Sequence, residues 1–160
     1  MYSNKNAIVF SYGAGGHSAQ ANRLAALLIP RLDSFYIISI SDDCITPKWS
    51  HIHFVTGEVR KKNSYFDTLT NMGPIKIIQT LLKIKKYNVR CVISNGPGIS
   101  VITALFFKVF GAKIIHVETW SRFVSKSLTG MAMYYIADVF YVQNKELCKI
   151  YKNAIYSGRL

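Results

Sequence analysis

The segment that most constrains the fold lies near the N-terminus, where an apolar run leads directly into a glycine-rich turn. Residues 7–10 read AIVF, and the ten residues after them read SYGAGGHSAQ, with His17 directly behind the glycines. A short apolar run predicts a buried strand, and glycines let the backbone turn sharply and approach a ligand closely. The helix that follows would direct unpaired N–H groups towards an anion. The segment therefore predicts a strand–turn–helix unit that binds phosphate beside a titratable imidazole.

The turn differs from the fingerprint of dinucleotide-binding proteins. It reads GxGGH where that fingerprint requires GxGxxG. No acidic residue stands at a clear strand end to bind a ribose, although Asp42 and Asp43 lie in the right region. The turn by itself thus indicates a phosphate group but not a nucleotide.

Short β-rich runs alternate with helical patterns along the rest of the chain. We expect strands at residues 7–11, 35–39, 51–55, 89–94, 113–117 and 138–142, with a further short strand at 154–156. We expect helices at residues 18–31, 74–86, 99–110, 121–136 and 145–151, and a long functional loop at 56–71. Several strands are continuous runs of Val, Ile and Phe, which is typical of a sheet covered on both faces. This order predicts an α/β fold with a doubly wound, mostly parallel, Rossmann-like sheet, in one domain that comprises residues 1–160.

Three strand ends carry residues that a plain connection does not need. They are the glycine-rich turn, the segment SNGPG at 94–98 and the segment HVETWSR at 116–122. Ligands bind beyond the carboxyl ends of the strands in sheets of this kind, so we expect the three segments to converge on one crevice. The candidate site residues are Gly13, Gly15, Gly16, His17, Asn95, Gly96, Gly98, Glu118 and Arg122.

Each segment also has a purely structural interpretation. His17 could cap its helix, and Pro97 could occupy the first position of the next one. Glu118 could pair with Arg122 four residues on, if both are helical. The remaining histidines are expected to pack within or beside strands rather than to bind ligands, and they are His51, His53 and His116.

The balance of charge indicates an anionic partner. The chain has 20 basic and 8 acidic residues, which give a net charge of +12. No recognition helix, zinc finger or RNA-binding aromatic pattern accompanies this charge, so we expect no nucleic-acid partner. Cys44, Cys91 and Cys148 lack the spacing of metal ligands, and we expect neither a metal nor a cofactor.

Basic and apolar residues alternate in the stretch PIKIIQTLLKIKKY, and a more apolar stretch follows at 99–110. One interpretation is an ordinary helix with a solvated lysine face; the other is a helix that lies on anionic lipid. No uninterrupted apolar stretch approaches the ~20 residues that a bilayer requires, and no signal peptide is visible. We therefore expect peripheral attachment on the cytoplasmic face of the cell membrane. The residues predicted to face the membrane are Lys76, Lys83, Lys85, Lys86, Phe106 and Phe107.

Together with these segments, further motifs extend the pattern to the C-terminus: SLTG at 127–130, AD at 137–138, VQ at 142–143 and YSGRL at 156–160. In this order they resemble the acceptor-binding, membrane-recruiting subunit of two-component UDP-sugar transferases, over nearly the whole chain. Eukaryotic members of that family carry an N-terminal membrane helix, which we do not expect here. A more distant likeness is to the N-terminal domain of the lipid II-forming N-acetylglucosaminyltransferase.

The resemblance implies the N-terminal half of a split, inverting GT-B glycosyltransferase. This subunit would bind a polyprenyl-diphosphate-linked saccharide in capsule or exopolysaccharide assembly, and a second subunit would carry the UDP-sugar-binding domain. The chain would be a hexosyltransferase subunit that is inactive without its partner. His17 would be the first candidate for the general base and Glu118 the second, while Arg122 and the glycine-containing turns would bind the acceptor's diphosphate.

Two alternatives remain open at this stage. The chain could be a non-catalytic membrane scaffold that recruits and activates the catalytic subunit. It could also be a nucleotide-binding enzyme that acts alone.

Overall fold

The computed structural model describes residues 6–56 and 73–160. Except for Thr56, the long loop expected at 56–71 lies outside this part of the chain. Seven strands form one sheet in the order β3-β2-β1-β4-β5-β6-β7, and every neighbouring pair is parallel. The strands are β1 (Asn6–Ser11), β2 (Tyr36–Ser41), β3 (Ile52–Val55), β4 (Asn88–Ser94), β5 (Lys113–Val117), β6 (Val139–Val142) and β7 (Ile155–Tyr156). The predicted Rossmann-like α/β fold is confirmed, and the sheet is parallel throughout.

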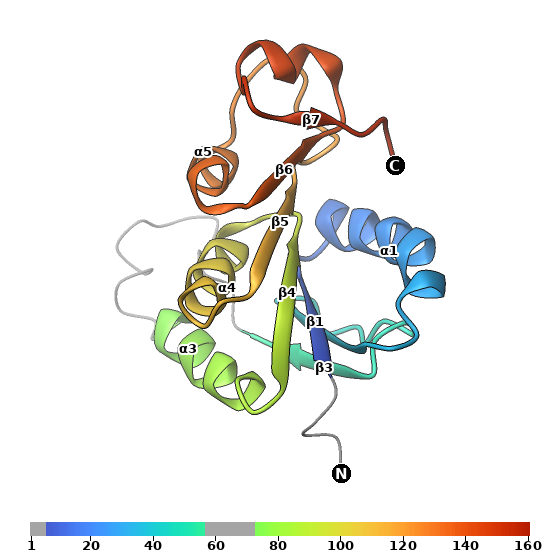
Figure 1. Cartoon of the computed structure of the whole chain (residues 1–160), viewed down its shortest axis with the longest axis vertical. Coiled ribbons are helices and arrows are strands. Elements are labelled where there is room, and N and C mark those ends of the chain that lie inside the picture. Colours follow the sequence, from blue (N-terminus) through green and yellow to red (C-terminus); the bar gives the residue numbers. More distant parts are fainter. Residues whose placement is uncertain (1–5, 57–72) are drawn as a thin grey trace.

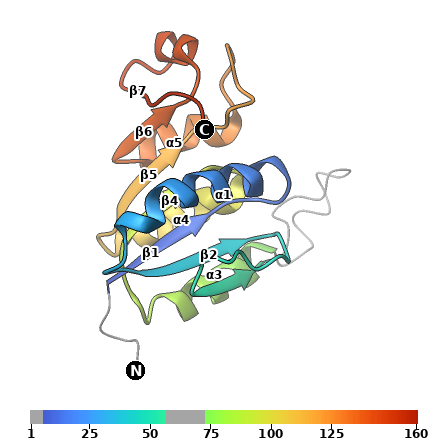
Figure 2. The ribbon, with the colours of Figure 1, turned by 90° about the vertical axis from the view of Figure 1, so that its right-hand side faces the viewer.

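Helices cover the two faces of this sheet unequally. Figure 1 shows α1 (Gly16–Leu28) on one face and α3 (Gly73–Ile84), α4 (Gly98–Val109) and α5 (Leu128–Ile136) on the other. In Figure 2, α1 lies in front of the strands. Two short 3₁₀-helices, η1 (Ile29–Arg31) and η2 (Lys145–Lys149), complete the described elements. No helix within residues 6–56 and 73–160 has the length and apolar character that a membrane crossing requires.

The alternation of side chains along β1 explains why a purely apolar strand forms here. Ala7 and Val9 pack in the larger core, towards α3, α4 and α5. Ile8 and Phe10 point the other way and pack with Ala21 of α1 in a second core. Because successive side chains of a strand point to opposite faces, a strand buried on both faces must be apolar throughout.

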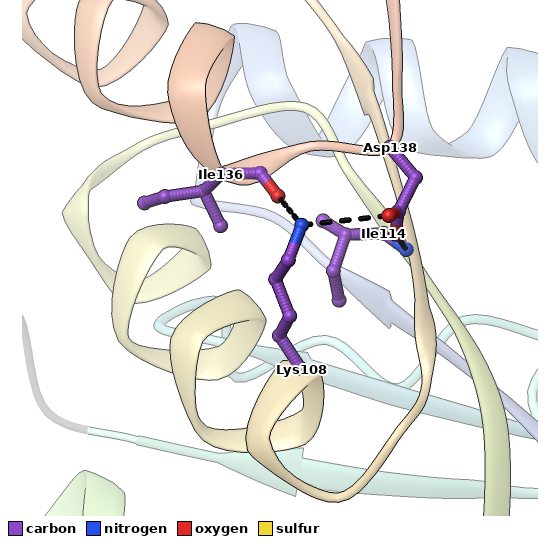
Figure 3. A network of polar contacts seen from close by, with 4 residues as sticks. All are labelled: Lys108, Ile114, Ile136 and Asp138. Carbon is purple, nitrogen blue, oxygen red and sulfur yellow. Dashed lines mark hydrogen bonds and ion pairs between the residues drawn. The ribbon is translucent and has the colours of Figure 1, made fainter.

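A polar clamp ties the end of α4 to the connection between α5 and β6 (Figure 3). The Lys108 Nζ donates a hydrogen bond to the Ile136 carbonyl oxygen and lies 3.4 Å from Asp138 Oδ1. The other carboxylate oxygen of Asp138 accepts a 2.7 Å bond from the backbone N–H of Ile114. That bond, with Lys108 nearby, holds the pKa of the Asp138 carboxyl below its usual value.

The structure corrects two predicted helices. The helix expected from residue 121 begins only at Leu128, because the Ser127 hydroxyl caps it by accepting a hydrogen bond from the backbone N–H of Gly130. Residues 119–127 therefore form a loop. The helix expected at 145–151 is the short 3₁₀-helix η2.

The structure also corrects one predicted membrane contact. Phe107 is 1% exposed and lies in the larger core, because α4 directs Thr103, Ala104 and Phe107 towards the sheet. Phe106, one position earlier, is partly buried against the same core. The four lysines predicted to face a membrane are exposed: Lys76, Lys83, Lys85 and Lys86.

Candidate functional site

The three unusual segments meet at one cleft of about 300 Å³. It lies beyond the carboxyl ends of β1, β4 and β5. At this point the strand order reverses, because β2 and β3 lie on one side of β1 whereas β4 and the later strands lie on the other. That reversal of strand order is where parallel sheets of this type bind ligands. The lining residues are His17, Asn95, Gly96, Pro97, Glu118, Thr119, Ser121, Arg122, Ser127, Leu128 and Thr129. The predicted convergence is confirmed for His17, Asn95, Gly96, Glu118 and Arg122.

A reciprocal pair of hydrogen bonds fixes the imidazole of His17. Its Nδ1 lies 2.7 Å from the backbone carbonyl oxygen of Asn95, and the Asn95 side-chain amide donates a 2.9 Å bond to the carbonyl oxygen of His17. A carbonyl oxygen only accepts, so Nδ1 carries the proton and Nε2 keeps its lone pair in the neutral ring. The ring also lies close over Gly96, whose φ is +80° and where a Cβ would be 3.1 Å from His17 Cε1. The arrangement suits proton abstraction by Nε2.

The glycine-rich turn itself is used differently from the prediction. Gly13, Gly15 and Gly16 are absent from the cleft lining. Gly13 is buried, and a Cβ there would lie 2.4 Å from Pro97 Cδ, so this glycine permits the first turn to pack against the second. Gly15, with a φ of +69°, precedes α1.

A carboxylate of the chain itself occupies one amide of this turn. The backbone N–H of Ala14 donates a 2.6 Å hydrogen bond to Asp42 Oδ1. Any phosphate at that amide would have to compete with this negative charge. From the sequence, Asp42 was considered only as a possible ribose ligand. Its position directly after β2 could have indicated that it lies at the same edge of the sheet as the glycine turn.

Glu118 lies at the back of the cleft and is 2% exposed. The Ser127 hydroxyl lies 3.2 Å from both carboxylate oxygens, the Thr119 N–H donates to Oε1 at 3.0 Å, and the Tyr151 hydroxyl lies 3.4 Å from Oε2. A Cβ on Gly130 would fall 1.7 Å from Oε2, so only glycine leaves room for the carboxylate at the start of α5. Burial, and then the nearby Glu118, raise the pKa of the Tyr151 phenol. Glu118 therefore anchors the beginning of α5.

The alternative pairing of Glu118 with Arg122 is not formed. The ion pairs of the described residues are Lys108–Asp138 and Lys149–Glu146, and Arg122 donates to the Ser125 hydroxyl instead. The four-residue rule holds for helices, and these residues lie in a loop. The Arg122 side chain is left at the mouth of the cleft.

The other histidines serve the sheet, as predicted. His51 Nδ1 accepts a 3.0 Å bond from the backbone N–H of Ile37, and His53 lies between the Ser39 hydroxyl and the Asp43 carbonyl. His116 is 1% exposed, with Nδ1 2.9 Å from the Ser94 hydroxyl. Burial, with a contribution from His17, lowers the pKa of His116 to about 3, so its ring is neutral. Within residues 6–56 and 73–160, no three His, Cys, Asp or Glu side chains group closely enough to hold a metal ion.

A second hollow, of about 330 Å³, lies on the face that α1 covers incompletely. Its wall combines α1, the middle strands and the last residues of the chain, and it is almost wholly apolar. The lining residues are Leu24, Leu27, Leu28, Ile93, Ile115, Val117, Tyr141, Ser157 and Leu160.

A parallel sheet with a glycine turn behind β1 and a polar cleft at its switch point defines a Rossmann-like α/β chain. Residues 8–160 match the sequence model of the family described as "Oligosaccharide biosynthesis protein Alg14 like". The chain thus belongs to the Alg14-like family.

Two relatives named "UDP-N-acetylglucosamine transferase subunit ALG14" illustrate this. The Kluyveromyces lactis protein is 30% identical, over 98% of this chain and 79% of that protein. The Mus musculus protein is 30% identical, over 92% and 80%. The chain is therefore a homologue of glycosyltransferase subunits.

Solved structures support the fold alone, because their sequence identities are low. Acinetobacter baumannii MurG matches with a TM-score of 0.60 and 13% identity, over 98% of this chain and 44% of that one. A putative UDP-N-acetylglucosamine 2-epimerase from Listeria monocytogenes matches with a TM-score of 0.68 and 11% identity, over 97% and 45%. The chain thus spans less than half the length of these solved proteins.

Proposed function

We propose that this chain is the acceptor-binding subunit of a two-component UDP-N-acetylglucosamine transferase. It binds a polyprenyl-diphosphate-linked saccharide in its cleft, in capsule or exopolysaccharide assembly, and a second subunit contributes the UDP-sugar site. The observation that carries the proposal is the cleft itself, which combines a histidine with a free Nε2 and an arginine at its mouth. The family and the names of the relatives support the donor and the divided architecture.

In the proposed mechanism, His17 is the general base. The acceptor hydroxyl attacks the anomeric carbon of the donor sugar, the bond from that carbon to the UDP oxygen breaks, and the hydroxyl proton passes to Nε2. The Asn95 carbonyl oxygen, 2.7 Å from Nδ1, stabilises the imidazolium that results. Glu118 is the weaker candidate because its carboxylate is buried and already accepts three hydrogen bonds. We assign it a positioning role instead.

The acceptor's diphosphate is proposed to lie between Arg122 and the turn that holds Asn95, Gly96 and Gly98. Arg122 offers the paired N–H groups that suit phosphate oxygens, and α4 begins at Gly98 with its unpaired N–H groups. Gly15 and Gly16, at the start of α1, are the part of the first turn that remains available. Gly13 has no phosphate contact in this proposal because Pro97 packs against it.

The membrane face is proposed to be the outer side of the α3, α4 and α5 layer. On α3 the apolar residues Ile75, Ile78 and Leu82 are exposed beside Lys76 and Lys83, and on α4 Leu105 is exposed. Apolar and basic side chains on one helix face suit an anionic lipid surface. Lys85, Lys86 and the partly buried Phe106 would lie at its margin. The protein would thus attach peripherally, on the cytoplasmic side.

The second subunit is proposed to contact the other face. The apolar hollow between α1 and the C-terminal residues leaves Leu27 57% exposed, which suits an apolar segment of a protein partner. This contact would leave the cleft and the outer side of α3 open.

The test is sugar transfer by the reconstituted pair, from UDP-N-acetylglucosamine to a polyprenyl-diphosphate-linked acceptor. His17→Gln should lower kcat by about 100-fold or more, which is the usual contribution of a general base, while the two subunits still co-purify. His51→Gln, an exposed histidine remote from the cleft, is the matched control and should leave kcat unchanged. The scaffold alternative requires full activity from His17→Gln. Turnover by the isolated chain would instead support an enzyme that acts alone.

A further inference from the structure

The loop between β5 and α5 carries an exposed apolar tip. Phe123 and Val124 are 50% and 74% exposed, and Leu128, where α5 begins, is 77% exposed. Single exposed apolar residues are ordinary on a protein surface. Here three lie within six residues, at one edge of a ligand cleft, and such a group marks an interaction surface.

The charged residues that flank this tip in the sequence are basic. Arg122 and Lys126 flank it, and the Arg159 guanidinium lies 5.4 Å from the centre of the Phe123 ring. Residues 119–137 contain no acidic side chain, and Glu118 at the base of the loop is buried. Apolar side chains with a cationic margin match an anionic lipid surface.

The same loop forms one wall of the cleft. Ser121 and Arg122 line the cleft before the tip, and Ser127 and Thr129 line it behind the tip. Leu128 does both, because it lines the cleft and is exposed. Polar residues of the loop thus line the ligand space, while Phe123 and Val124 are exposed and do not line it.

Several contacts hold the loop in place. The Trp120 N–H donates to the side chain of Gln20 at 3.4 Å, and the guanidinium of Arg23 lies 4.9 Å from the centre of the Trp120 ring. The Asn144 side chain donates to the carbonyl oxygens of Trp120 and Arg122. The tip is therefore presented at a defined position relative to the cleft.

We propose that Phe123, Val124 and Leu128 insert into an anionic bilayer and seat the mouth of the cleft at the lipid–water boundary. The diphosphate of a lipid-linked acceptor lies at that boundary, next to Arg122, and the lipid chain leaves the cleft past Leu128. Insertion of the tip stands on the exposure and charge of the loop. Only the identity of the lipid ligand rests on the proposed function.

The test is sedimentation of the whole chain with vesicles of phosphatidylcholine containing phosphatidylglycerol, which hold neither acceptor nor partner. The double variant Phe123→Ser, Val124→Ser should bind these vesicles about tenfold more weakly, because two apolar side chains no longer enter the lipid. Ile45→Ser is the matched control, since Ile45 is 75% exposed on a different loop, and it should bind like the unaltered chain. Val124→Trp should bind more tightly than the unaltered chain, because tryptophan favours the membrane interface.

Unchanged vesicle binding by the double variant would overturn the proposal, as would an equal loss in Ile45→Ser. Unchanged vesicle binding with loss of partner co-purification would assign the tip to the second subunit instead. Sugar transfer is not part of this measurement, so its result is independent of the His17 test. If the double variant binds vesicles more weakly as expected, but the unaltered chain and its partner transfer no sugar, the membrane role of the tip stands and only the transferase assignment is refuted.

Discussion

Replacing His116 by glutamine should remove a pH dependence of stability that the unaltered chain carries. His116 is 1% exposed in β5, and its neighbours across the sheet are Ser94 and Phe140. Burial lowers its pKa from 6.5 to about 3, with a smaller contribution from His17. Below about pH 6.5, His116 is therefore protonated in the unfolded chain but stays neutral in the folded chain.

The sign and size of the effect follow from these two pKa values. Because the pKa is lower in the folded state, acid favours unfolding, and stability falls as the pH drops from 6.5 towards 3. Each pH unit in this window costs about 1.4 kcal/mol. Between pH 7.5 and 4.5 the loss through His116 alone is on the order of 3 kcal/mol, which is a large part of the stability of a typical domain.

Urea unfolding followed by circular dichroism at pH 7.5, 6.5, 5.5 and 4.5 measures this loss. Subtracting the His116→Gln curve from the curve of the unaltered chain removes the contributions of the titrating groups that do not interact with His116, and leaves those of His116 and of its smaller coupling to His17. The difference should be nearly flat above pH 6.5 and steepen below it. A difference that stays constant down to pH 4.5 would refute the reasoning, because the ring would then be protonated as readily in the folded chain as in the unfolded one.

Two further substitutions test the packing and the charge around the cleft. Gly130→Ala should lower the free energy of unfolding by about 3 kcal/mol, because the new Cβ would overlap the buried Glu118 carboxylate. Gly16→Ala is the control and should leave the stability in urea nearly unchanged, because a Cβ at Gly16 would meet no atom within 4 Å. Equal effects of the two substitutions would contradict this packing. Asp42→Asn should bind inorganic pyrophosphate about fivefold more tightly in calorimetry, because a negative charge leaves the glycine turn while the oxygen that accepts from Ala14 remains. Asp43→Asn, whose side chain instead accepts from the Ile45 N–H, is the control, and the same gain in both variants would show that the effect is not local.

The strands of this fold were predictable because each one is short, apolar and bounded by turn residues. All seven expected strands are present, and the glycine turn, the Asn95 turn and the Glu118 strand end meet as parallel topology requires. The helix expected from residue 121 began late because a serine cap outweighs the helical pattern before it. Phe107 was misassigned because its stretch of α4 is apolar on more than one side, which leaves the orientation of the helix open.

The roles of individual site residues were less predictable, because they depend on partners far away in the sequence. A pairing of Glu118 with Arg122, four residues on, was one of two interpretations of the sequence, yet the Glu118 carboxylate is held by Ser127 and Tyr151. The glycine turn was expected to be open to phosphate, yet Asp42, 28 residues away, occupies its Ala14 amide.

By itself, the sequence determined the parallel α/β architecture, the positions of the three turns and their convergence at one edge of the sheet. It could do so because the periodicity of apolar side chains and the glycine punctuation are local properties. Only the tertiary structure decided which nitrogen of His17 keeps its lone pair, that Gly13 serves packing against Pro97, and that Glu118 anchors α5. The physical reason is that these outcomes depend on distances between atoms of different turns, which are set by strand register and helix packing.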